Sequence, residues 1–293
     1  MHIPSSWHAP DFTNLSGLLM VVGAPDAGKS TFARYLYEQL AGRRMAAAFL
    51  DGDPGQSALG PPATITLAFG QTSEIFETSG ISRAPAQTRR WFIGSVSPRG
   101  HMLPMLVGAA RLVEAAQEAG AAAIVYDTDG LIDAAQGGLN LKLALIALLR
   151  PSVVFAIQIR DEMEALLQPL RSSRRTRLVT LAPSAQVQRR DPSARQEHRA
   201  RQFAAYFAQA RGLEIDWRER PVFPRSAFSY QQLLALEDAA GYCLGLGIVL
   251  EADMQRKRLN LFTPIPAVDN VDALHLGDLT LDPHTCRDQP LFP

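Results

Sequence analysis

The sequence predicts an α/β fold, with a parallel sheet covered by helices on both faces and a small C-terminal β-rich unit. Short apolar runs alternate with helical patterns over the first two thirds of the chain. A glycine-rich turn joins the first apolar run to the first helical pattern. From about Pro221 the helical patterns stop and prolines and glycines become more frequent. Alternating strands and helices are typical of parallel strands joined by crossover helices.

The individual elements follow from the spacing of apolar residues. The run 17–22 is short, apolar and followed by a glycine, as a buried parallel strand is. In 30–41, Phe32, Leu36 and Leu40 recur at helical spacing. Further strands are expected at 46–50, 64–69, 90–93, 121–126, 152–157 and 178–181, and further helices at 103–119 and 139–149. Apolar runs at 243–250, 259–262 and 279–281 indicate the second unit, so we expect domains at 1–220 and 221–293.

Composition narrows the class of protein. Lys plus Arg and Asp plus Glu both total 29, so the formal net charge is zero. This argues against a protein that binds nucleic acid through its overall positive charge, but it allows a local basic patch. Two cysteines cannot make a disulfide scaffold, and their spacing suggests no zinc site. The first residues lack the pattern of a signal peptide, and no run approaches ~20 apolar residues. We expect a soluble cytoplasmic protein with no membrane partner.

The turn after the first strand fits the phosphate-binding pattern G-x-x-x-x-G-K-[ST]. Glycines let successive backbone N–H groups converge on a phosphate, and the following helix directs its positive end at the same anion. Lys29 is expected to reach the β- and γ-phosphates, and the Ser30 hydroxyl to bind magnesium. The residues of this loop are Gly23, Ala24, Pro25, Asp26, Ala27, Gly28, Lys29 and Ser30.

Two acidic segments follow later strands. Asp53 stands after the second strand, beside the expected phosphate site, and is our candidate for orienting and deprotonating an attacking hydroxyl. Asp51 could support magnesium through water, and a plain solvated turn is the alternative for this segment. Asp127 follows a later strand and is expected to hold a magnesium-bound water. The string Asp127-Thr-Asp-Gly also resembles a GTPase switch, but no guanine-specifying Asn-Lys-x-Asp follows.

With these motifs, the chain resembles the polynucleotide 5′-hydroxyl kinases, the ATP-dependent RNA kinases of tRNA splicing, mRNA 3′-end formation and ribosomal RNA processing. The resemblance covers roughly 18–281 and includes Asp26, the Ser30-Thr31 pair and the segment from Gly94 to Pro98. Asp53 matches the family's catalytic aspartate and is followed by Gly55 and Gln56. The resemblance implies ATP and Mg²⁺ as cofactors, with Thr31 and Gln56 among the binding residues. It also implies a 5′-OH end of RNA or DNA as the acceptor of the γ-phosphate; protein partners stay unknown.

A basic segment matches the family's lid, which closes over the transferring phosphate. Residues 171–201 hold nine arginines against Asp191 and Glu197. Guanidinium groups spread several donors over phosphate oxygens and stabilise the charge of a moving phosphoryl group. The resemblance places the lid at about 184–202, with Arg190 and Arg195 as its catalytic arginines. A solvated basic helix is the alternative.

Two departures from the family keep other functions open. The family usually carries an N-terminal β domain, and about 17 residues precede the first strand here, so we expect that domain to be absent. The family also tends to place a base-stacking tryptophan where this chain has Leu131, and Asp129 adds a negative charge nearby. One alternative is therefore an ATP-binding scaffold of a nucleic-acid-processing complex that catalyses nothing. Another is a GTP-dependent switch or metallochaperone-type NTPase.

Overall fold

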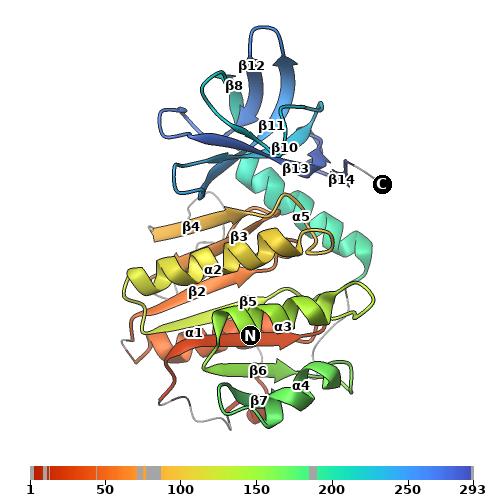
Figure 1. The fold of residues 1–293 in the computed structure, drawn as a ribbon. Coiled ribbons are helices and arrows are strands. Elements are labelled where there is room, and N and C mark those ends of the chain that lie inside the picture. Colours follow the sequence, from red (N-terminus) through yellow and green to blue (C-terminus); the bar gives the residue numbers. More distant parts are fainter. Residues whose placement is uncertain are drawn as a thin grey trace.

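The computed structural model describes residues 3–8, 12, 14–43, 45–70, 75–76, 87–184 and 190–291 (Figure 1). These residues form two sheets of seven strands each, and helix α5 (Pro192–Phe207) lies between them. The first sheet carries the phosphate loop, and the second is formed by residues 211–290. The α/β fold with a C-terminal β unit is thereby confirmed.

The first sheet has the strand order β4-β3-β2-β5-β1-β6-β7. Its centre is parallel: β1 pairs with β5 and β6, β2 with β5, and β6 with β7. The carboxyl ends of β1, β2 and β5 therefore meet at one edge, where ligands bind in open α/β sheets. The strands are β1 (Gly17–Gly23), β2 (Ala47–Gly52), β3 (Thr64–Phe69), β4 (Gln87–Phe92), β5 (Ala123–Thr128), β6 (Val153–Ile157) and β7 (Arg177–Leu181).

Strands β3 and β4 differ from the parallel arrangement that the sequence predicts. β3 runs antiparallel to β2, and β4 runs antiparallel to β3. Residues 53–63, which join β2 to β3, contain no helix. A parallel neighbour requires a crossover connection, whereas a chain that turns back directly pairs antiparallel. The sheet is therefore mixed, with a parallel centre and two antiparallel strands at one side.

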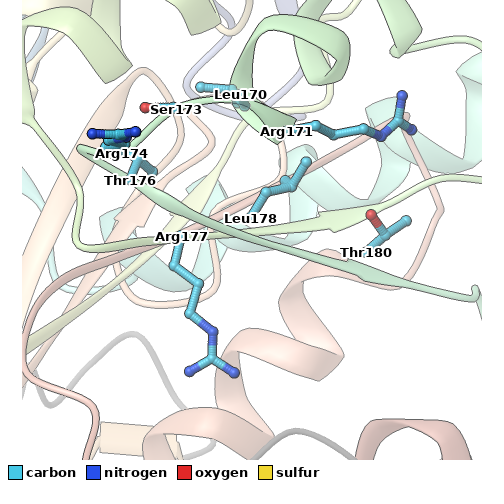
Figure 2. A pocket seen from close by; sticks show the side chains of 8 residues that line it. All are labelled: Leu170, Arg171, Ser173, Arg174, Thr176, Arg177, Leu178 and Thr180. Atoms are coloured by element: carbon cyan, nitrogen blue, oxygen red, sulfur yellow. The ribbon is translucent and has the colours of Figure 1, made fainter.

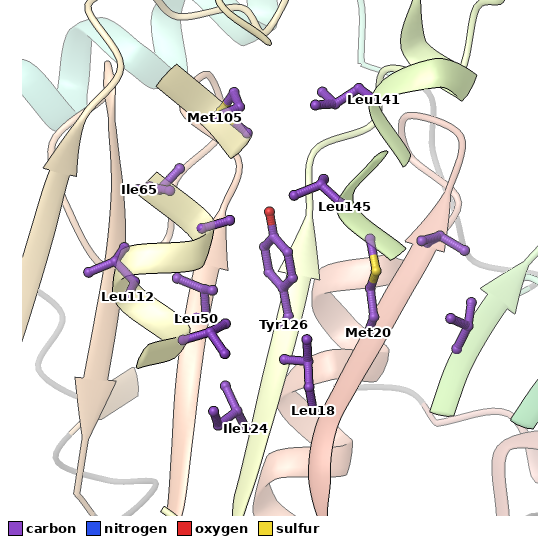
Figure 3. Packing of buried hydrophobic residues seen from close by; sticks show 14 of the residues in the cluster. Leu18, Met20, Leu50, Ile65, Met105, Leu112, Ile124, Tyr126, Leu141 and Leu145 are labelled. Atoms are coloured by element: carbon purple, nitrogen blue, oxygen red, sulfur yellow. The ribbon is translucent and has the colours of Figure 1, made fainter. Parts of the chain in front are cut away.

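Helices cover both faces of this sheet, as predicted. Helices α2 (Met102–Glu118), α3 (Gly138–Leu149) and α4 (Glu164–Arg171) pack on one face, where Tyr126 and Met20 project from the central strands (Figure 3). Helix α1 (Lys29–Ala41) and the 3-10 helix η1 (Ser5–His8) cover the other face. Burial of both faces explains why the central strands are apolar along their whole length.

The second sheet is antiparallel except where β9 pairs with β13. Strand β8 belongs to this sheet because it pairs with β12, although it lies before residue 221 in the chain. Phe203 and Phe207 of α5 pack in its core together with Phe92 at the end of β4. The strands are β8 (Arg211–Asp216), β9 (Val222–Phe223), β10 (Gln232–Glu237), β11 (Cys243–Asp253), β12 (Arg258–Thr263), β13 (Ala273–Leu281) and β14 (Asp288–Pro290).

The described helices include none long and apolar enough to cross a membrane. Cys243 and Cys286 are both buried and carry free thiols. No disulfide therefore links the described parts of the chain.

Candidate active site

The phosphate loop connects β1 to α1. Asp26 and Gly28 adopt left-handed backbone conformations, with φ of 56° and 97°, which turn the chain tightly enough for its N–H groups to converge. The loop also lies close to β6, since a Cβ at Gly23 would come 2.7 Å from the Ile157 carbonyl oxygen. Lys29 is 7% exposed and its Nζ donates a hydrogen bond to the Ala24 carbonyl at 2.9 Å. Burial lowers the pKa of Lys29, although Asp127 and Asp53 oppose the shift.

A cleft of about 760 Å³ opens beside this loop, at the carboxyl ends of the central strands. Its walls come from the loop, from the segments that follow β2, β4 and β5, and from α5. Of the residues proposed from the sequence, those that line it are Pro25, Asp26, Gly28, Lys29, Ser30, Thr31, Asp53, Gln56, Arg190 and Arg195. The structure therefore brings together residues that lie up to 170 positions apart in the chain.

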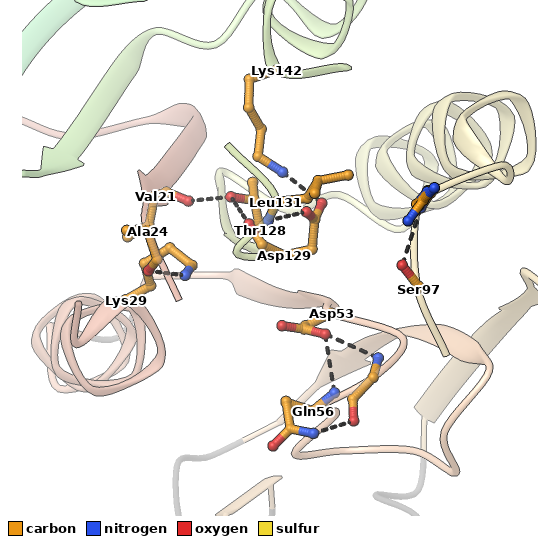
Figure 4. Close-up of polar contacts among 12 residues, drawn as sticks. Val21, Ala24, Lys29, Asp53, Gln56, Ser97, Thr128, Asp129, Leu131 and Lys142 are labelled. Carbon is orange, nitrogen blue, oxygen red and sulfur yellow. Dashed lines mark hydrogen bonds and ion pairs between the residues drawn. The ribbon is translucent and has the colours of Figure 1, made fainter. Parts of the chain in front are cut away.

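Asp53 follows β2 and lines the cleft. Its Oδ1 accepts hydrogen bonds from the backbone N–H groups of Gly55 at 2.9 Å and Gln56 at 3.0 Å (Figure 4). Its Oδ2 accepts none from the described residues. Burial and the charge of Asp129 raise the pKa of Asp53, while Lys29 and the two backbone donors oppose the rise. The side chain is thus fixed through one oxygen and presents the other.

Asp51, predicted to support magnesium, does not line the cleft. It is 2% exposed, and its Oδ2 accepts hydrogen bonds from the Ser57 hydroxyl at 2.8 Å and from the N–H groups of Ala58 and Leu59 at 2.6 and 2.9 Å. Burial raises its pKa to about 6. In the structure Asp51 therefore fixes the segment after Asp53, and three donors already occupy one of its oxygens.

Asp127 lies at the end of β5, directly beside the start of α1. It is 3% exposed, and the neighbouring Ser30 hydroxyl opposes the rise of its pKa. Its Oδ1 is buried without a hydrogen-bond partner among the described residues. Burial raises its pKa to about 7, against the pull of Lys29. A hydroxyl and a carboxylate with a free oxygen form the kind of all-oxygen donor set that suits Mg²⁺, so these two residues fit the predicted metal.

The two predicted lid arginines lie over the loop, at the start of α5. The Arg195 guanidinium donates to Asp26 Oδ2 at 2.7 Å, and the Arg190 backbone N–H donates to the same oxygen at 3.1 Å. The Arg190 guanidinium also reaches Gln56 Oε1 at 3.4 Å. Asp191 caps the helix by accepting from the Ala194 N–H at 2.7 Å. Residues 185–189 of the predicted lid lie outside the described residues.

Further along α5, Arg199 of the predicted basic segment and two residues that the sequence did not indicate, His198 and Gln202, also line the cleft. Arg199 pairs with Asp288 of β14 through two hydrogen bonds of 2.9 and 3.1 Å. The Gln202 amide donates to the Ser57 carbonyl. Burial and the neighbouring arginines lower the pKa of His198, which also lines the cleft. Gln202 stands three residues after Arg199 and four after His198, which places it beside both on the helix surface, and this spacing was the only sequence signal for Gln202 and His198.

An ion pair that the sequence did not predict lies behind another wall of the cleft. Lys142 of α3 is fully buried, and its Nζ lies 2.5 Å from Asp129 Oδ2 (Figure 4). The other carboxylate oxygen of Asp129 accepts from the Leu131 N–H at 2.8 Å. The sequence signal for this pair was Lys142, the one charged residue in the mostly apolar helix α3. Leu131 itself lines the cleft with Ile132, at the position where the family tends to have a tryptophan.

A second hollow, of about 490 Å³, lies along β7, the last strand of the first sheet (Figure 2). Arg174, Arg177 and Thr180 line it, and none of the predicted site residues does. Charged side chains on an exposed edge strand prevent it from pairing with another chain. Protection of the sheet edge therefore accounts for the arginines that line this hollow.

The site has the parts of a P-loop nucleotide-binding protein: a phosphate loop between strand and helix, a carboxylate beside its serine, and arginines above it. Comparison with protein families identifies which one. The family model for the P-loop domain of the mRNA cleavage and polyadenylation factor CLP1 matches residues 23–209. The chain belongs to this family, because the match covers more than half of its length.

Relatives and solved structures agree with this assignment. The chain is 23% identical to a polyribonucleotide 5′-hydroxyl-kinase of Methanocaldococcus jannaschii, over 90% of this chain and 87% of that protein. It is 25% identical to a protein of the same name from Pyrococcus furiosus, over 88% and 86%. Clp1p in its complex with Pcf11p has the same fold, with a TM-score of 0.69 and 14% identity over 92% of this chain and 75% of that one. The resemblance to polynucleotide 5′-hydroxyl kinases is confirmed.

Proposed function

We propose that this protein is an ATP-dependent polynucleotide 5′-hydroxyl kinase, which transfers the γ-phosphate of ATP to the 5′-OH of an RNA end. The observation that carries the proposal is the placement of Asp53 in one cleft with Lys29 of the phosphate loop and Arg195 of α5. A nucleotide-binding protein without catalysis needs the loop alone. A kinase also needs a base for the acceptor and cations for the moving phosphoryl group.

Asp53 acts as the general base in this proposal. Its free oxygen takes the proton of the 5′-hydroxyl as the 5′ oxygen bonds to the γ-phosphorus and the bond to the β–γ bridging oxygen breaks, which releases ADP. Burial raises the pKa of Asp53, and a base is more effective when its pKa approaches the working pH. The hydrogen bonds from Gly55 and Gln56 hold the carboxylate in place, so little orientation is lost in the transition state.

The loop and the end of β5 bind the triphosphate. Lys29 is expected to leave the Ala24 carbonyl and bind the β- and γ-phosphates. Ser30 and Asp127 would hold Mg²⁺, which neutralises phosphate charge when bound. The unpaired Asp127 oxygen supports this assignment. Asp51 stays a second candidate for support through water, although its hydrogen bonds to residues 57–59 favour a role in holding the Asp53 segment.

Arg190 and Arg195 stabilise the negative charge on the moving phosphoryl group. Both lie at the mouth of the cleft, and Arg195 is one third exposed, so its guanidinium can exchange Asp26 for a phosphate oxygen. Such arginines contribute mostly in the transition state, because charge develops there.

RNA is the favoured acceptor because the curated relatives are named for polyribonucleotides. The cleft itself offers apolar side chains from Val96, Pro98, Leu131 and Ile132 beside the polar Gln136. Aliphatic side chains can pack against a base of either nucleic acid, so the composition of this wall leaves DNA as an outcome for experiment.

The test is incubation of the purified protein with γ-labelled ATP and Mg²⁺ and a panel of acceptors: 5′-OH RNA, 5′-OH DNA and a nucleoside. We expect label on the RNA end and none on an otherwise identical RNA that already carries a 5′-phosphate. ATP binding with no transfer to any acceptor would indicate a scaffold. A strong preference for GTP would contradict the kinase assignment and favour a switch or metallochaperone-type NTPase.

A further inference from the structure

The buried pair Lys142–Asp129 has no role in the mechanism above. Both side chains are at most 2% exposed, and Nζ and Oδ2 are 2.5 Å apart. Asp129 nevertheless lines the cleft, whereas Lys142 lies behind it, on the second turn of α3. Charges are rarely buried, because each must leave water. A pair kept at the wall of a cleft that receives phosphates therefore calls for an explanation.

Asp129 anchors the segment that forms this wall. Its Oδ1 accepts from the Leu131 N–H at 2.8 Å. Just before it, the Thr128 hydroxyl donates to the Val21 carbonyl at 2.8 Å. Gly130 packs against the phosphate loop so closely that a Cβ would lie 2.9 Å from Pro25 Cα. The 129–132 segment is thus fixed to the loop on one side and to α3 on the other, where a Cβ at Gly138 would lie 2.7 Å from the Leu131 carbonyl.

The charges around the cleft show what Lys142 changes. Asp26 is balanced by Arg195, and Asp53 has Lys29 nearby. Among the described ion pairs the cationic partner of Asp129 is Lys142, and Lys29 acts on Asp129 more weakly than it does on Asp127 and Asp53. Without that ammonium group, an ionised carboxylate would face the cleft in which a phosphodiester chain must approach. At short range in a partly buried site, one uncompensated charge is strongly repulsive to an anion.

We propose that Lys142 is a positioning residue for the acceptor strand: it holds Asp129, and through it the 129–132 wall, and offsets the carboxylate charge that the strand would otherwise meet. The inference rests on the proposed kinase function. Lys142 touches neither substrate and acts only through Asp129. The class of ligand concerned is a polyanionic nucleic-acid end, since a neutral acceptor is insensitive to this charge.

The test compares Lys142→Met with the double variant Asp129→Asn plus Lys142→Met. Asparagine keeps an oxygen for the Leu131 N–H but removes the charge. We expect Lys142→Met to raise KM for a ten-nucleotide 5′-OH RNA about tenfold, the effect of one unbalanced charge at short range, with a smaller change in kcat. KM for an uncharged nucleoside should change less than about twofold, as its interaction with a lone charge is weak. The double variant should recover the wild-type KM for RNA.

The matched control is Lys257→Met, since Lys257 stacks on Trp217 in the second sheet and does not line the cleft. Equal KM values for the RNA in wild type, Lys142→Met and the double variant would overturn the inference, as would equal losses for RNA and nucleoside. Failure of the wild type to label any acceptor would instead contradict the proposed function.

Lys142→Met leaves a buried carboxylate unpaired, and its folding must be checked by circular dichroism. If it does not fold, the single variant Asp129→Asn tests the same inference from the opposite side. It removes the carboxylate and leaves the positive charge of Lys142 unbalanced beside the cleft. We then expect a lower KM for RNA and a steeper increase of KM with salt than in the wild type. An unchanged KM with an unchanged salt dependence would overturn the inference.

Discussion

Arg195 of helix α5 is bound to Asp26 of the phosphate loop through a 2.7 Å hydrogen bond between unlike charges. The same carboxylate oxygen also accepts the Arg190 N–H. One loop residue, held in a left-handed conformation with φ of 56°, thereby receives both predicted lid residues. The start of α5 and the phosphate loop are therefore joined through Asp26.

Replacing this carboxylate should loosen the start of α5 when the protein is measured without added nucleotide. In Asp26→Asn the charge-assisted bond to Arg195 is weakened, so backbone amides at 190–195 should exchange hydrogen faster. Hydrogen exchange measured by mass spectrometry checks this. Asp191→Asn is the matched control, because asparagine also caps a helix and leaves the Asp26 contacts in place. Equal protection of 190–195 in Asp26→Asn and the wild type would contradict the contact.

The role of Asp53 can be separated from nucleotide binding. Asp53→Asn should lower kcat for 5′ phosphorylation by about 10²–10⁴ because the general base is lost, with a nearly unchanged Kd for ATP. Steady-state labelling and a binding titration measure the two quantities. Asp133→Asn makes the same chemical change on the exposed rim of the cleft and should retain activity. An equal loss in both variants would show that general electrostatics, and not a base, is responsible.

The pH dependence of the reaction follows from the environment of Asp53. Burial and Asp129 raise the pKa of Asp53, so at a given acidic pH more of it is protonated and inactive. The log of kcat/KM should therefore rise with pH through a midpoint above the ~3.9 of an ordinary aspartate. In Asp129→Asn that midpoint should move down. A pH–rate profile from about 4 to 8 checks both statements, and a profile with no acid limb above pH 4 would exclude them.

The bond between α5 and the C-terminal sheet should contribute strongly to stability. Asp288 is 6% exposed and pairs with Arg199 through two hydrogen bonds. Arg199→Ala leaves that carboxylate buried and unpaired, and should lower the free energy of unfolding by about 3–5 kcal/mol. Arg258→Ala removes an arginine that pairs at the surface with Glu214 and Asp216, and it should cost about 0–1 kcal/mol. Urea unfolding of both variants measures the difference, and equal costs would refute it.

The contact between Gly130 and the phosphate loop should be sensitive to a single methyl group. An alanine Cβ at 130 would lie 2.9 Å from Pro25 Cα. Since backbone atoms have no room to move independently, the loop must shift, and the affinity for ATP should fall at least tenfold, as expected for a misplaced binding loop. Gly212→Ala is the control, because its nearest neighbour would be at an ordinary 3.7 Å. Unchanged ATP affinity in Gly130→Ala would show that the loop tolerates the shift.

The sequence predicted what depends on local pattern. The strand before Gly23 and the helix from Lys29 could be predicted because apolar spacing and the glycine motif are both properties of neighbouring residues. Asp53 and Ser30 were placed in one cleft by the rule that parallel strands end at the same edge. The reversed direction of β3 was missed, because nothing in the apolar pattern of a strand distinguishes parallel from antiparallel pairing.

Ion pairs between residues on different elements could not be predicted, for a different reason. Lys142 and Asp129 are 13 residues apart on different elements, and Arg199 and Asp288 are 89 apart. Neither pair leaves a repeated spacing in the sequence, so only the packing of the helices brings them together. For Asp51 the local pattern suggested a role that its contacts in the fold do not favour. Its position near Asp53 suggested support of a metal, but in the structure its carboxylate binds residues 57–59, whose conformation the motif does not determine.

The two ends of α5 are held by different partners. Phe203 and Phe207 are embedded in the core of the second sheet, while Arg195, two turns earlier, rests on the phosphate loop. Movement of the whole helix as a rigid body would therefore break the packing of Phe203 and Phe207 in that core. If the cleft opens, we expect the first turn of α5 to move relative to its C-terminal half, which the core of the second sheet holds in place.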